Sequence, residues 1–500
     1  MRARPVLRAP FARPARWARP PPPGRLAPGE HAAIWLLALV VIGQFIPWGS
    51  NTVLLASGAA AADVACAILV LALLGPAAPQ AFWPKLIVPG SLFLAAFAWG
   101  ALGLTGGAAG GWPGPLRLAA GATTASLTPD LTVVELAKLA GAGAIVLAAA
   151  LVGTRRRRLE AAVAVLLALG SAYVLLGLAL YRSHPFEVFG MAKGAHQWRF
   201  TGTLLNGNAA GCAFAVLLAL SADGVRTAIT RIAEAPSGLK TALAHRLILR
   251  GAQLFVFAAA CAMTASRATL ACAAVTVVAI AAWPRGRQAR SSGKDRRLGG
   301  AAWAGAGLLA VLALGLVGAV LLSGSQTLAR TDDWRAGVAH RADAYALLAA
   351  KTGDAAARGY GLGAFADVNL HGLDASQADT VWNFRAAHDA GLQAALEAGL
   401  PFLVLIGAAL GAILVQAART SPASSAWPLR RGLFVASAVV LACSAVDIAL
   451  NVPAVAALAM TVVGFLHGGS CPPSSPGPAD DVARERLEAG EFRSRRPSAA

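Results

Sequence analysis

The chain has 500 residues, of which 57% are hydrophobic and 13% are charged, and its mean hydropathy is +0.61. This composition excludes a soluble globular protein and predicts a protein that crosses a membrane many times. The formal net charge of +19 indicates affinity for anionic membrane lipid, with nucleic-acid binding a poor second interpretation.

Residues 1–30 are rich in arginine and proline. This composition predicts a disordered, basic cytoplasmic tail rather than a cleavable signal peptide. Residues 31–468 form the predicted membrane domain, and residues 469–500 a second disordered cytoplasmic tail. Apolar runs near the twenty residues that a helix needs to cross hydrocarbon predict an all-α, polytopic bundle, because such long, unalternating runs exclude a β-barrel. The twelve predicted spans are 31–49, 52–74, 86–104, 131–153, 159–181, 204–222, 247–265, 267–283, 300–322, 394–417, 432–449 and 452–468.

Lysine and arginine predict the orientation of these spans. With the N-terminus inside, 31 of the 43 basic residues fall on the inner side, as the positive-inside rule requires. An even number of spans then places both termini in the cytoplasm. Residues 323–393 become a large outer loop that carries short helices.

The outer face carries three arginines on separate segments. Arg199 lies between the fifth and sixth spans, Arg267 in the tight turn between the seventh and eighth, and Arg341 in the large loop. Arginine suits the binding of a phosphate group, because its planar fork donates paired hydrogen bonds and stays charged. The alternative for each is a side chain that only anchors a helix end at the membrane boundary.

His388 ends the longest polar interval of the chain and is a candidate general base. The alternative is an ordinary solvated histidine in a loop. Glu397, near the outer end of the tenth span, lies on the opposite side of any continuous helix that includes His388. The two would therefore meet only if His388 precedes the helix; otherwise Glu397 could pair with an arginine.

Other polar groups predict no metal site and no cofactor. The six cysteines show no paired spacing, and the histidines of the outer face lack the spacing of metal ligands. Asp332 and Asp333 are interpreted as a solvated acidic pair beside Arg330 and Arg335. The run from Gly359 to Gly363 is predicted to shape a turn.

Two further expectations concern acidic and basic residues within or beside the apolar runs. Asp447 and Asn451 are predicted to cap a break between the last two spans, with Pro453 opening the next helix. Asp63 and Lys138 lie inside predicted spans, and the sequence assigns no partner to either.

The order of these motifs resembles that of the O-antigen ligase and polymerase superfamily. The matching set is Arg199-Phe200-Thr201-Gly202-Thr203 with Asn206 and Asn208, then Ser266-Arg267, Arg341 with Tyr345, the Gly359 to Gly363 run, His388 with Gly399, and the segment from Val446 to Pro453. Asp389 and Gly391 stand where many members have Asn and Tyr, and Asn206-Gly207-Asn208 replaces the commoner Asn-Pro-Asn.

The resemblance implies an inverting, metal-independent glycosyltransferase on the periplasmic face of a bacterial inner membrane. It would move a glycan from a polyprenyl (undecaprenyl) diphosphate carrier to an acceptor hydroxyl, during lipopolysaccharide or surface polysaccharide assembly. The acceptor would be a lipid A core sugar or a growing glycan. The implied roles are diphosphate binding by Arg199, Arg267 and Arg341, catalysis by His388 and Glu397, and support from Asn206, Asn208 and Tyr345.

Alternatives remain open. A repeat-unit polymerase or a protein O-glycosylation ligase would use the same chemistry on another acceptor. A transporter or flippase of lipid-linked substrates is a different class, and it should gather polar groups near the middle of the membrane within repeated halves. The arginine and histidine candidates lie at the outer boundary instead, which favours an enzyme.

Overall fold

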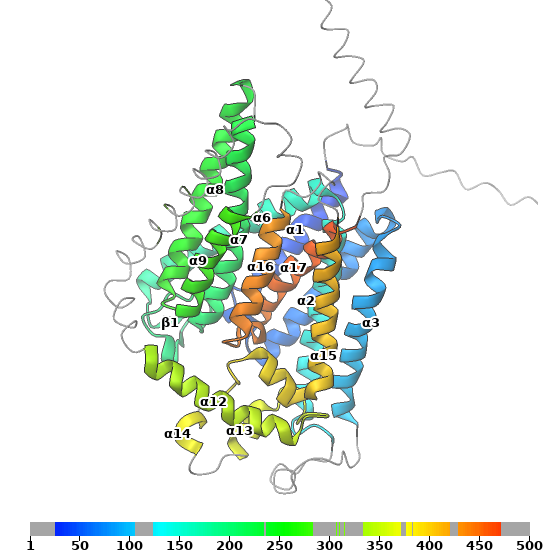
Figure 1. Cartoon of the computed structure of the whole chain (residues 1–500), viewed down its shortest axis with the longest axis vertical. Coiled ribbons are helices and arrows are strands. Elements are labelled where there is room, and N and C mark those ends of the chain that lie inside the picture. Colours follow the sequence, from blue (N-terminus) through cyan, green and yellow to red (C-terminus); the bar gives the residue numbers. More distant parts are fainter. Residues whose placement is uncertain are drawn as a thin grey trace, which may run out of the picture.

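The structure is a computed structural model that describes residues 26–105, 124–234, 237–283, 334–371, 377–382, 384–420 and 429–471, together with residues 307, 310 and 315. It is mostly helical (Figure 1). The helices are α1 (Pro28–Gly43), α2 (Val53–Leu74), α3 (Phe82–Ala101), α5 (Pro129–Gly153), α6 (Arg156–Ser183), α7 (Gly207–Glu234), α8 (Ser237–Met263), α9 (Arg267–Ala282), α12 (Trp334–Asp354), α13 (Phe365–His371), α14 (Ala378–Val381), α15 (Ala390–Arg419), α16 (Arg430–Ser444) and α17 (Pro453–Gly469).

Short elements connect some of these helices. Between α6 and α7, strands β1 (Glu187–Val188) and β2 (Met191–Ala192) form an antiparallel pair in which Val188 faces Met191. Single 3-10 turns occupy Trp48–Ser50, Gly75–Ala77, Leu102–Leu104, Gly194–His196 and Ala449–Asn451.

The described helices confirm a multi-pass membrane protein. Seven of them, α2, α3, α5, α6, α7, α8 and α15, are long and apolar enough to cross a membrane, and α1, α9 and α17 are apolar but shorter. Every predicted span overlaps a described helix except 300–322, nearly all of which lies outside the described residues. The predicted tails lie outside them too, apart from the start of α1 at Pro28 and the few residues that follow α17.

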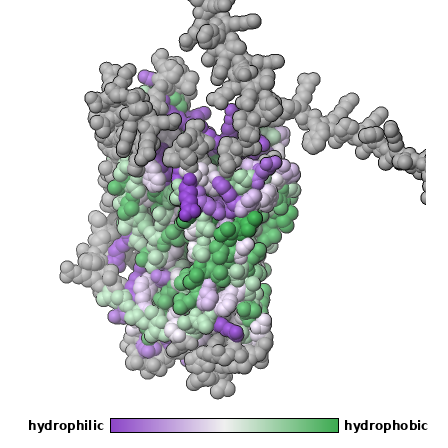
Figure 2. Space-filling view, turned by 45° about the vertical axis from the view of Figure 1, so that its right-hand side comes forward, coloured by the Kyte–Doolittle hydropathy of each residue, from purple (hydrophilic) through white to green (hydrophobic). Residues whose placement is uncertain are grey.

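The surface of the bundle suits contact with lipid. Large apolar side chains point outward along the helices: Leu54 is 81% exposed, and Ile68, Leu94, Val275 and Val404 are more than half exposed. Figure 2 shows a belt of hydrophobic surface, with hydrophilic residues gathered above it. An apolar area of this size would be unfavourable in water and is stable in hydrocarbon.

The core of the bundle contains α17, which is buried along almost its whole length and packs against α5. Two glycines of α17, Gly464 and Gly468, lie one turn apart on the face toward α5. A Cβ atom added to Gly464 would lie 2.5 Å from the carbonyl oxygen of Val146, and one added to Gly468 would overlap that of Ala150. Small residues at this spacing let two helix backbones approach closely in a membrane.

Gly468→Val is therefore expected to destabilise the bundle by about 1–3 kcal/mol, because the added side chain must displace the α5 backbone. Thermal unfolding of the detergent-purified chain measures the effect. Gly407→Val in α15 is the matched control, since nothing lies within 4 Å of a Cβ at that position. Equal melting temperatures for the two variants would contradict the close contact of α17 with α5.

The two ends of the bundle differ. Helices α12, α13 and α14 lie across one end, at the bottom of Figure 1, which we call the α12 end. The opposite end carries the start of α6 and the starts of α8 and α16, and we call it the basic end after its arginines. These include Arg155, Arg156, Arg157, Arg158, Arg231, Arg246, Arg430 and Arg431.

Lys138 and Asp63, the charged residues to which the sequence assigns no partner, both have one in the structure. Lys138 pairs with Glu135 one turn earlier in α5, at 2.7 Å. Asp63 of α2 accepts a 2.6 Å hydrogen bond from the side-chain amide of Gln44, which follows α1. Local pairing lowers the cost of placing such groups in a membrane helix.

Candidate active site at the α12 end

The loops of the α12 end contain unusual backbone conformations. Among the residues that the structure describes, six other than glycine have a positive φ, and all six lie in or beside these loops: Trp48, Ser50, Phe189, Trp198, Ala265 and His388. Side chains disfavour this region of conformational space, so such residues persist only where the surrounding structure holds them. Their concentration at one end marks that end as the candidate site.

Arg199 is held by three different segments. Its Nε donates to the carbonyl of Thr264 at 2.6 Å, its Nη1 to Nδ1 of His196 at 2.9 Å, and its Nη2 to Oδ1 of Asn208 at 2.7 Å. Only 8% of the residue is exposed. Arg199 therefore joins the loop after α6, the turn between α8 and α9, and the start of α7.

The Asn206-Gly207-Asn208 segment forms the start of α7 around this arginine. Asn206 Oδ1 accepts from the backbone N–H of Asn208 (2.8 Å) and of Ala209 (3.3 Å), as a helix cap does. A Cβ at Gly207 would lie 3.0 Å from Nε of Arg199, so the guanidinium packs directly on the backbone. Asn208 then links Arg199 to Asp447, to which its Nδ2 also donates.

Asp447 is the centre of the network. It is buried, and its carboxylate accepts hydrogen bonds from Asn208 and from the backbone N–H of Ile448. Its Oδ1 lies 3.9 Å from Nδ1 of His388. Burial alone would raise the pKa of Asp447, but His388, the Ile448 N–H and Asn208 together hold that pKa below its usual value. The carboxylate is therefore charged at neutral pH.

His388 precedes α15 and is fixed from both sides. Its φ is +57°, its carbonyl accepts a 2.8 Å hydrogen bond from the Tyr345 hydroxyl, and its ring meets the ring of Phe384 edge to face at 4.9 Å. Nδ1 is buried beside Asp447, whereas 31% of the side chain is exposed. An anion beside Nδ1 favours the proton on that nitrogen and leaves Nε2 able to accept one.

Arg341 of α12 completes the network by donating from Nη1 to the carbonyl of Val446 at 3.2 Å. The structure thus brings together Arg199, Asn206, Asn208, Arg341, Tyr345 and His388, all singled out from the sequence. Asp447 joins them, although the sequence assigned it only a capping role. A carboxylate within an apolar run near the outer boundary was the signal that could have identified it.

Metal coordination is not favoured by this arrangement. Asp447 and His388 are residue types that bind metal ions. Within the described part of the chain, however, no group of three His, Cys, Asp or Glu side chains lies close enough to hold one.

Arg267 is near this network but outside its hydrogen bonds. It is the first residue of α9, directly after Ser266, whose hydroxyl caps the helix by accepting from Thr269 N–H. Its side chain is exposed, and no described carboxylate forms an ion pair with it. The same turn contributes the Thr264 carbonyl to Arg199, so Arg267 lies three residues along the chain from a group that Arg199 binds.

The structure does not bring Glu397 to His388. Its carboxylate accepts hydrogen bonds from the backbone N–H groups of Gly363 (2.9 Å) and Phe365 (3.3 Å) and from the Gln393 side chain (3.0 Å). His388 precedes α15, as a direct pair would require, yet Glu397 points to the Gly359–Gly363 turn. Its partners in the structure are backbone and amide groups of this turn and of α15, and the catalytic role that the resemblance implies for Glu397 stays a prediction.

The Gly359–Gly363 segment is the turn that the sequence predicts. All three of its glycines have positive φ, and the N–H groups of Tyr360 and Gly361 donate to the carbonyls of Leu396 and Glu397 at 3.0 and 2.7 Å. These bonds lie where α15 is interrupted at Gly399 (φ +82°). The turn therefore fixes the first part of α15, and with it His388, against the rest of the α12 end.

Lys193 is a residue of this end that the sequence analysis missed. It is buried, its Nζ donates to the carbonyls of Pro185 (3.0 Å) and Arg199 (3.2 Å), and it lies 5.0 Å from the centre of the Tyr181 ring. Burial lowers the pKa of Lys193 to about 8. Its contacts hold the loop that presents Arg199.

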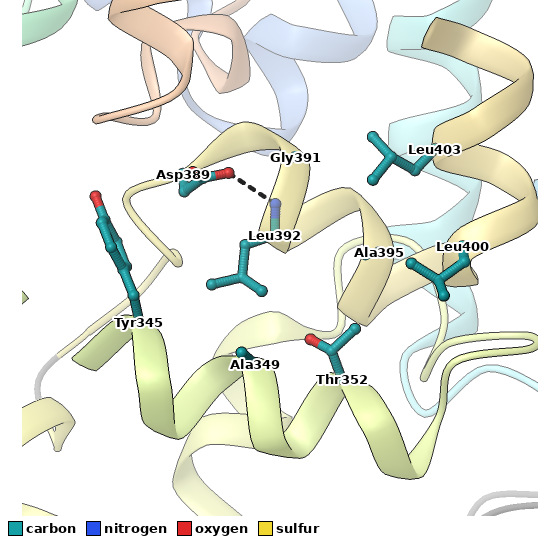
Figure 3. A pocket seen from close by; sticks show the side chains of 9 residues that line it. All are labelled: Tyr345, Ala349, Thr352, Asp389, Gly391, Leu392, Ala395, Leu400 and Leu403. Carbon is teal, nitrogen blue, oxygen red and sulfur yellow. Dashed lines mark hydrogen bonds between the residues drawn. The ribbon is translucent and has the colours of Figure 1, made fainter. Parts of the chain in front are cut away.

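A cavity of about 400 Å³ lies beside the network, between α12 and α15 (Figure 3). Tyr345 and Asp389 form its polar side, and Leu400 and Leu403 form its apolar side. Asp389 also caps α15 by accepting from Leu392 N–H at 2.7 Å. The shape and lining suit a molecule with both polar and apolar parts.

No protein-family model matches the chain, and none of the curated proteins matches it.

Proposed function

We propose that the protein is an inverting glycosyltransferase that moves a glycan from a polyprenyl diphosphate carrier to an acceptor hydroxyl, as the resemblance to O-antigen ligases and polymerases implies. One observation carries the proposal: a histidine ring lies beside a buried carboxylate, which is joined through Asn208 to a fixed arginine, while Arg341 binds the carbonyl of the preceding residue, Val446. A general base next to a cluster of guanidinium groups is what transfer from a diphosphate requires.

In the proposed reaction the acceptor oxygen attacks the anomeric carbon from the side opposite the diphosphate. Nε2 of His388 takes the acceptor proton, while Asp447 stabilises the imidazolium that forms. The bond between the anomeric carbon and the diphosphate oxygen breaks, and the diphosphate leaves with the electron pair. Attack from the opposite side inverts the anomeric centre.

The three arginines are assigned different roles in this reaction. Arg267 and Arg341 are assigned to the diphosphate, because neither has a described carboxylate partner and charge grows on the leaving oxygens. Arg199 is saturated by protein groups, so its proposed part is to position Asn208 and to add positive charge beneath the site. The cavity between Tyr345 and Leu403 would accept part of an amphiphilic substrate.

Orientation is part of the proposal. The arginines of the basic end support a cytoplasmic location for that end under the positive-inside rule, and the α12 end would then face the periplasm of a bacterial inner membrane. The twelve-span topology and the outer loop at 323–393 belong to the same proposal. Glycan transfer outside the cytoplasm has no nucleotide sugar to draw on, so the bond energy must arrive with the lipid carrier.

Replacing His388 by alanine tests the function in cells. In the organism that encodes the chain, the variant is expected to abolish the glycan product and to accumulate the carrier-linked glycan. Gel analysis of surface polysaccharide and extraction of lipid-linked glycan measure both. Unchanged polysaccharide on lipid A, together with normal carrier-linked glycan, would refute the base assignment. His371→Ala, in an exposed histidine of α13, is the control.

Arg267→Lys probes the diphosphate contact. Lysine keeps the charge but loses the fork, so the variant is expected to transfer glycan about 10-fold more slowly at limiting donor concentration. Initial rates at varied donor concentration measure the change. A variant with the wild-type dependence on donor would show that Arg267 does not bind the diphosphate bidentately.

A transporter is the second candidate, and it is motivated by Asp63 near the middle of α2. Its bond to Gln44 makes it a single hydrogen-bonded pair between α1 and α2. If the chain is a transferase, the Asp63→Asn variant is expected to retain full glycan transfer. Loss of substrate movement with this variant, and normal movement with His388→Ala, would favour the transporter.

A further inference from the structure

The basic end contains a second cavity, remote from the α12 end. It has a volume of about 660 Å³ and lies among the first turns of α6, the last turns of α7 and the first half of α8. Leu26, before α1, and Leu429, before α16, also line it. Nothing in the proposed transfer reaction uses it.

Positive charge dominates the polar part of this cavity. Four arginines from three helices line it, Arg157, Arg231, Arg246 and Arg250, against one carboxylate, Glu160. The four guanidinium groups thus share a single lining acid, which leaves an excess of positive charge. Such an excess attracts an anion with more than one negative charge.

Two of the four arginines already have partners. Arg231 lies 3.4 Å from Glu160, and Arg250 donates to the Gln253 side chain at 2.8 Å. Arg157 and Arg246 are exposed and have no hydrogen-bond or ion-pair partner among the described residues. Arg246 and Arg250 also lie one turn apart on α8, where like charges repel unless an anion lies between them.

The rest of the lining is apolar. Leu249 of α8 contributes exposed apolar surface to its wall, beside small residues such as Ala164, and the fully buried Leu167 of α6 and Leu220 of α7 form the apolar layer beneath. Leu249 is 58% exposed on a helix that is long and apolar enough to cross a membrane. A soluble anion would gain nothing from these walls, whereas an acyl chain would be buried against them.

We infer that this cavity binds an anionic membrane phospholipid, with the headgroup phosphates among the four arginines and an acyl chain along the exposed apolar surface at Leu249. The excess of positive charge favours a lipid with two phosphates, of the cardiolipin class, over one with a single phosphate. Basic pockets between membrane helices are known to suit such headgroups. The inference is independent of glycan transfer, because its residues belong to the opposite end of the bundle.

Native mass spectrometry of the whole detergent-purified chain tests the inference, with cardiolipin, phosphatidylglycerol or phosphatidylcholine added. Cardiolipin is expected to bind most tightly and phosphatidylcholine most weakly. The double variant Arg157→Gln/Arg246→Gln should weaken cardiolipin binding about 25-fold, since each basic residue near a membrane surface contributes roughly fivefold. This variant leaves both existing arginine contacts in place.

Three matched variants separate the site from charge in general. Arg419→Gln removes an exposed arginine of the basic end that does not line the cavity, and it should leave binding unchanged. Arg157→Lys/Arg246→Lys keeps the charge and should retain most of the affinity. Ala164→Phe fills the apolar part and should lower lipid binding while all four arginines remain.

Several results would overturn the inference. Equal cardiolipin binding by the wild type and the double glutamine variant would do so, as would equal affinity for phosphatidylcholine. Displacement of the lipid by inorganic diphosphate at matched concentration would show that the cavity recognises a soluble anion instead. Full lipid binding by Ala164→Phe would show that no acyl chain lies in the apolar part of the cavity.

Discussion

Asp447→Asn is expected to lower the rate of glycan transfer about 10²- to 10⁴-fold, the range that a positioned general base supplies. The carboxylate lies beside Nδ1 of His388 and accepts from Asn208. Asparagine has nearly the same shape, but it removes the negative charge that stabilises the imidazolium. The fold should persist, so the loss is expected mainly in kcat, with a smaller fall in melting temperature because the charged carboxylate also stabilises the fold.

The matched control for this variant is Asp343→Asn, which removes an exposed carboxylate of α12 at the same end of the bundle. Its activity should equal that of the wild type. The low pKa of Asp447 also predicts how stability depends on pH. The contribution of the charged carboxylate to the free energy of unfolding is complete above the pKa of the unfolded chain, near 3.8, and is lost as the pH falls through the pKa of the folded protein. A wild-type kcat for the Asp447→Asn variant would show that the Asp447 carboxylate takes no part in the mechanism.

Arg199→Lys is the second change with a large expected effect. Lysine cannot reach the Thr264 carbonyl, His196 and Asn208 at the same time, as the guanidinium does. The loop after α6 would then separate from the α8–α9 turn, and Asn208 would lose its orientation. Misplacement of the site by about 1 Å costs roughly 100-fold in rate, which is the loss we expect.

Transfer assays and melting temperatures measure the Arg199→Lys effect together, because the same bonds hold three segments in place. Arg182→Lys is the control, since Arg182 is an exposed arginine at the end of α6. A variant at position 199 that kept both full activity and full stability would contradict the central position of this guanidinium.

The apolar runs were sufficient to predict the helical class, because lipid requires each span to satisfy its own backbone. Local signals also identified the turn at Gly359–Gly363 and the start of α17 at Pro453. Helix ends were less predictable. The run 31–49 contains Pro47 and two residues of positive φ, Trp48 and Gly49, so α1 ends at Gly43.

The features that the sequence did not predict depend on contacts between residues far apart in the chain. Gly399 and Pro401 in the run 394–417 are typical of a break in a helix, but nothing in the run indicates that Ala357 packs against Gly399. Likewise Glu397 binds the backbone of Gly363 and Phe365, which lie more than thirty positions away. The contact of Asp447 with Asn208 joins residues 239 positions apart. Spacing along one helix cannot predict partners that belong to another.

Reconstituted transfer is the most direct test of the account. The purified chain in liposomes would be given a polyprenyl diphosphate-linked glycan and lipid A core acceptor, and both the released carrier diphosphate and the glycosylated acceptor would be measured. The account predicts equal amounts of the two products from the wild type, with inverted anomeric configuration, and at least about 100-fold less from His388→Ala. Product formation at the same rate by His388→Ala, or retention of the anomeric configuration, would contradict it.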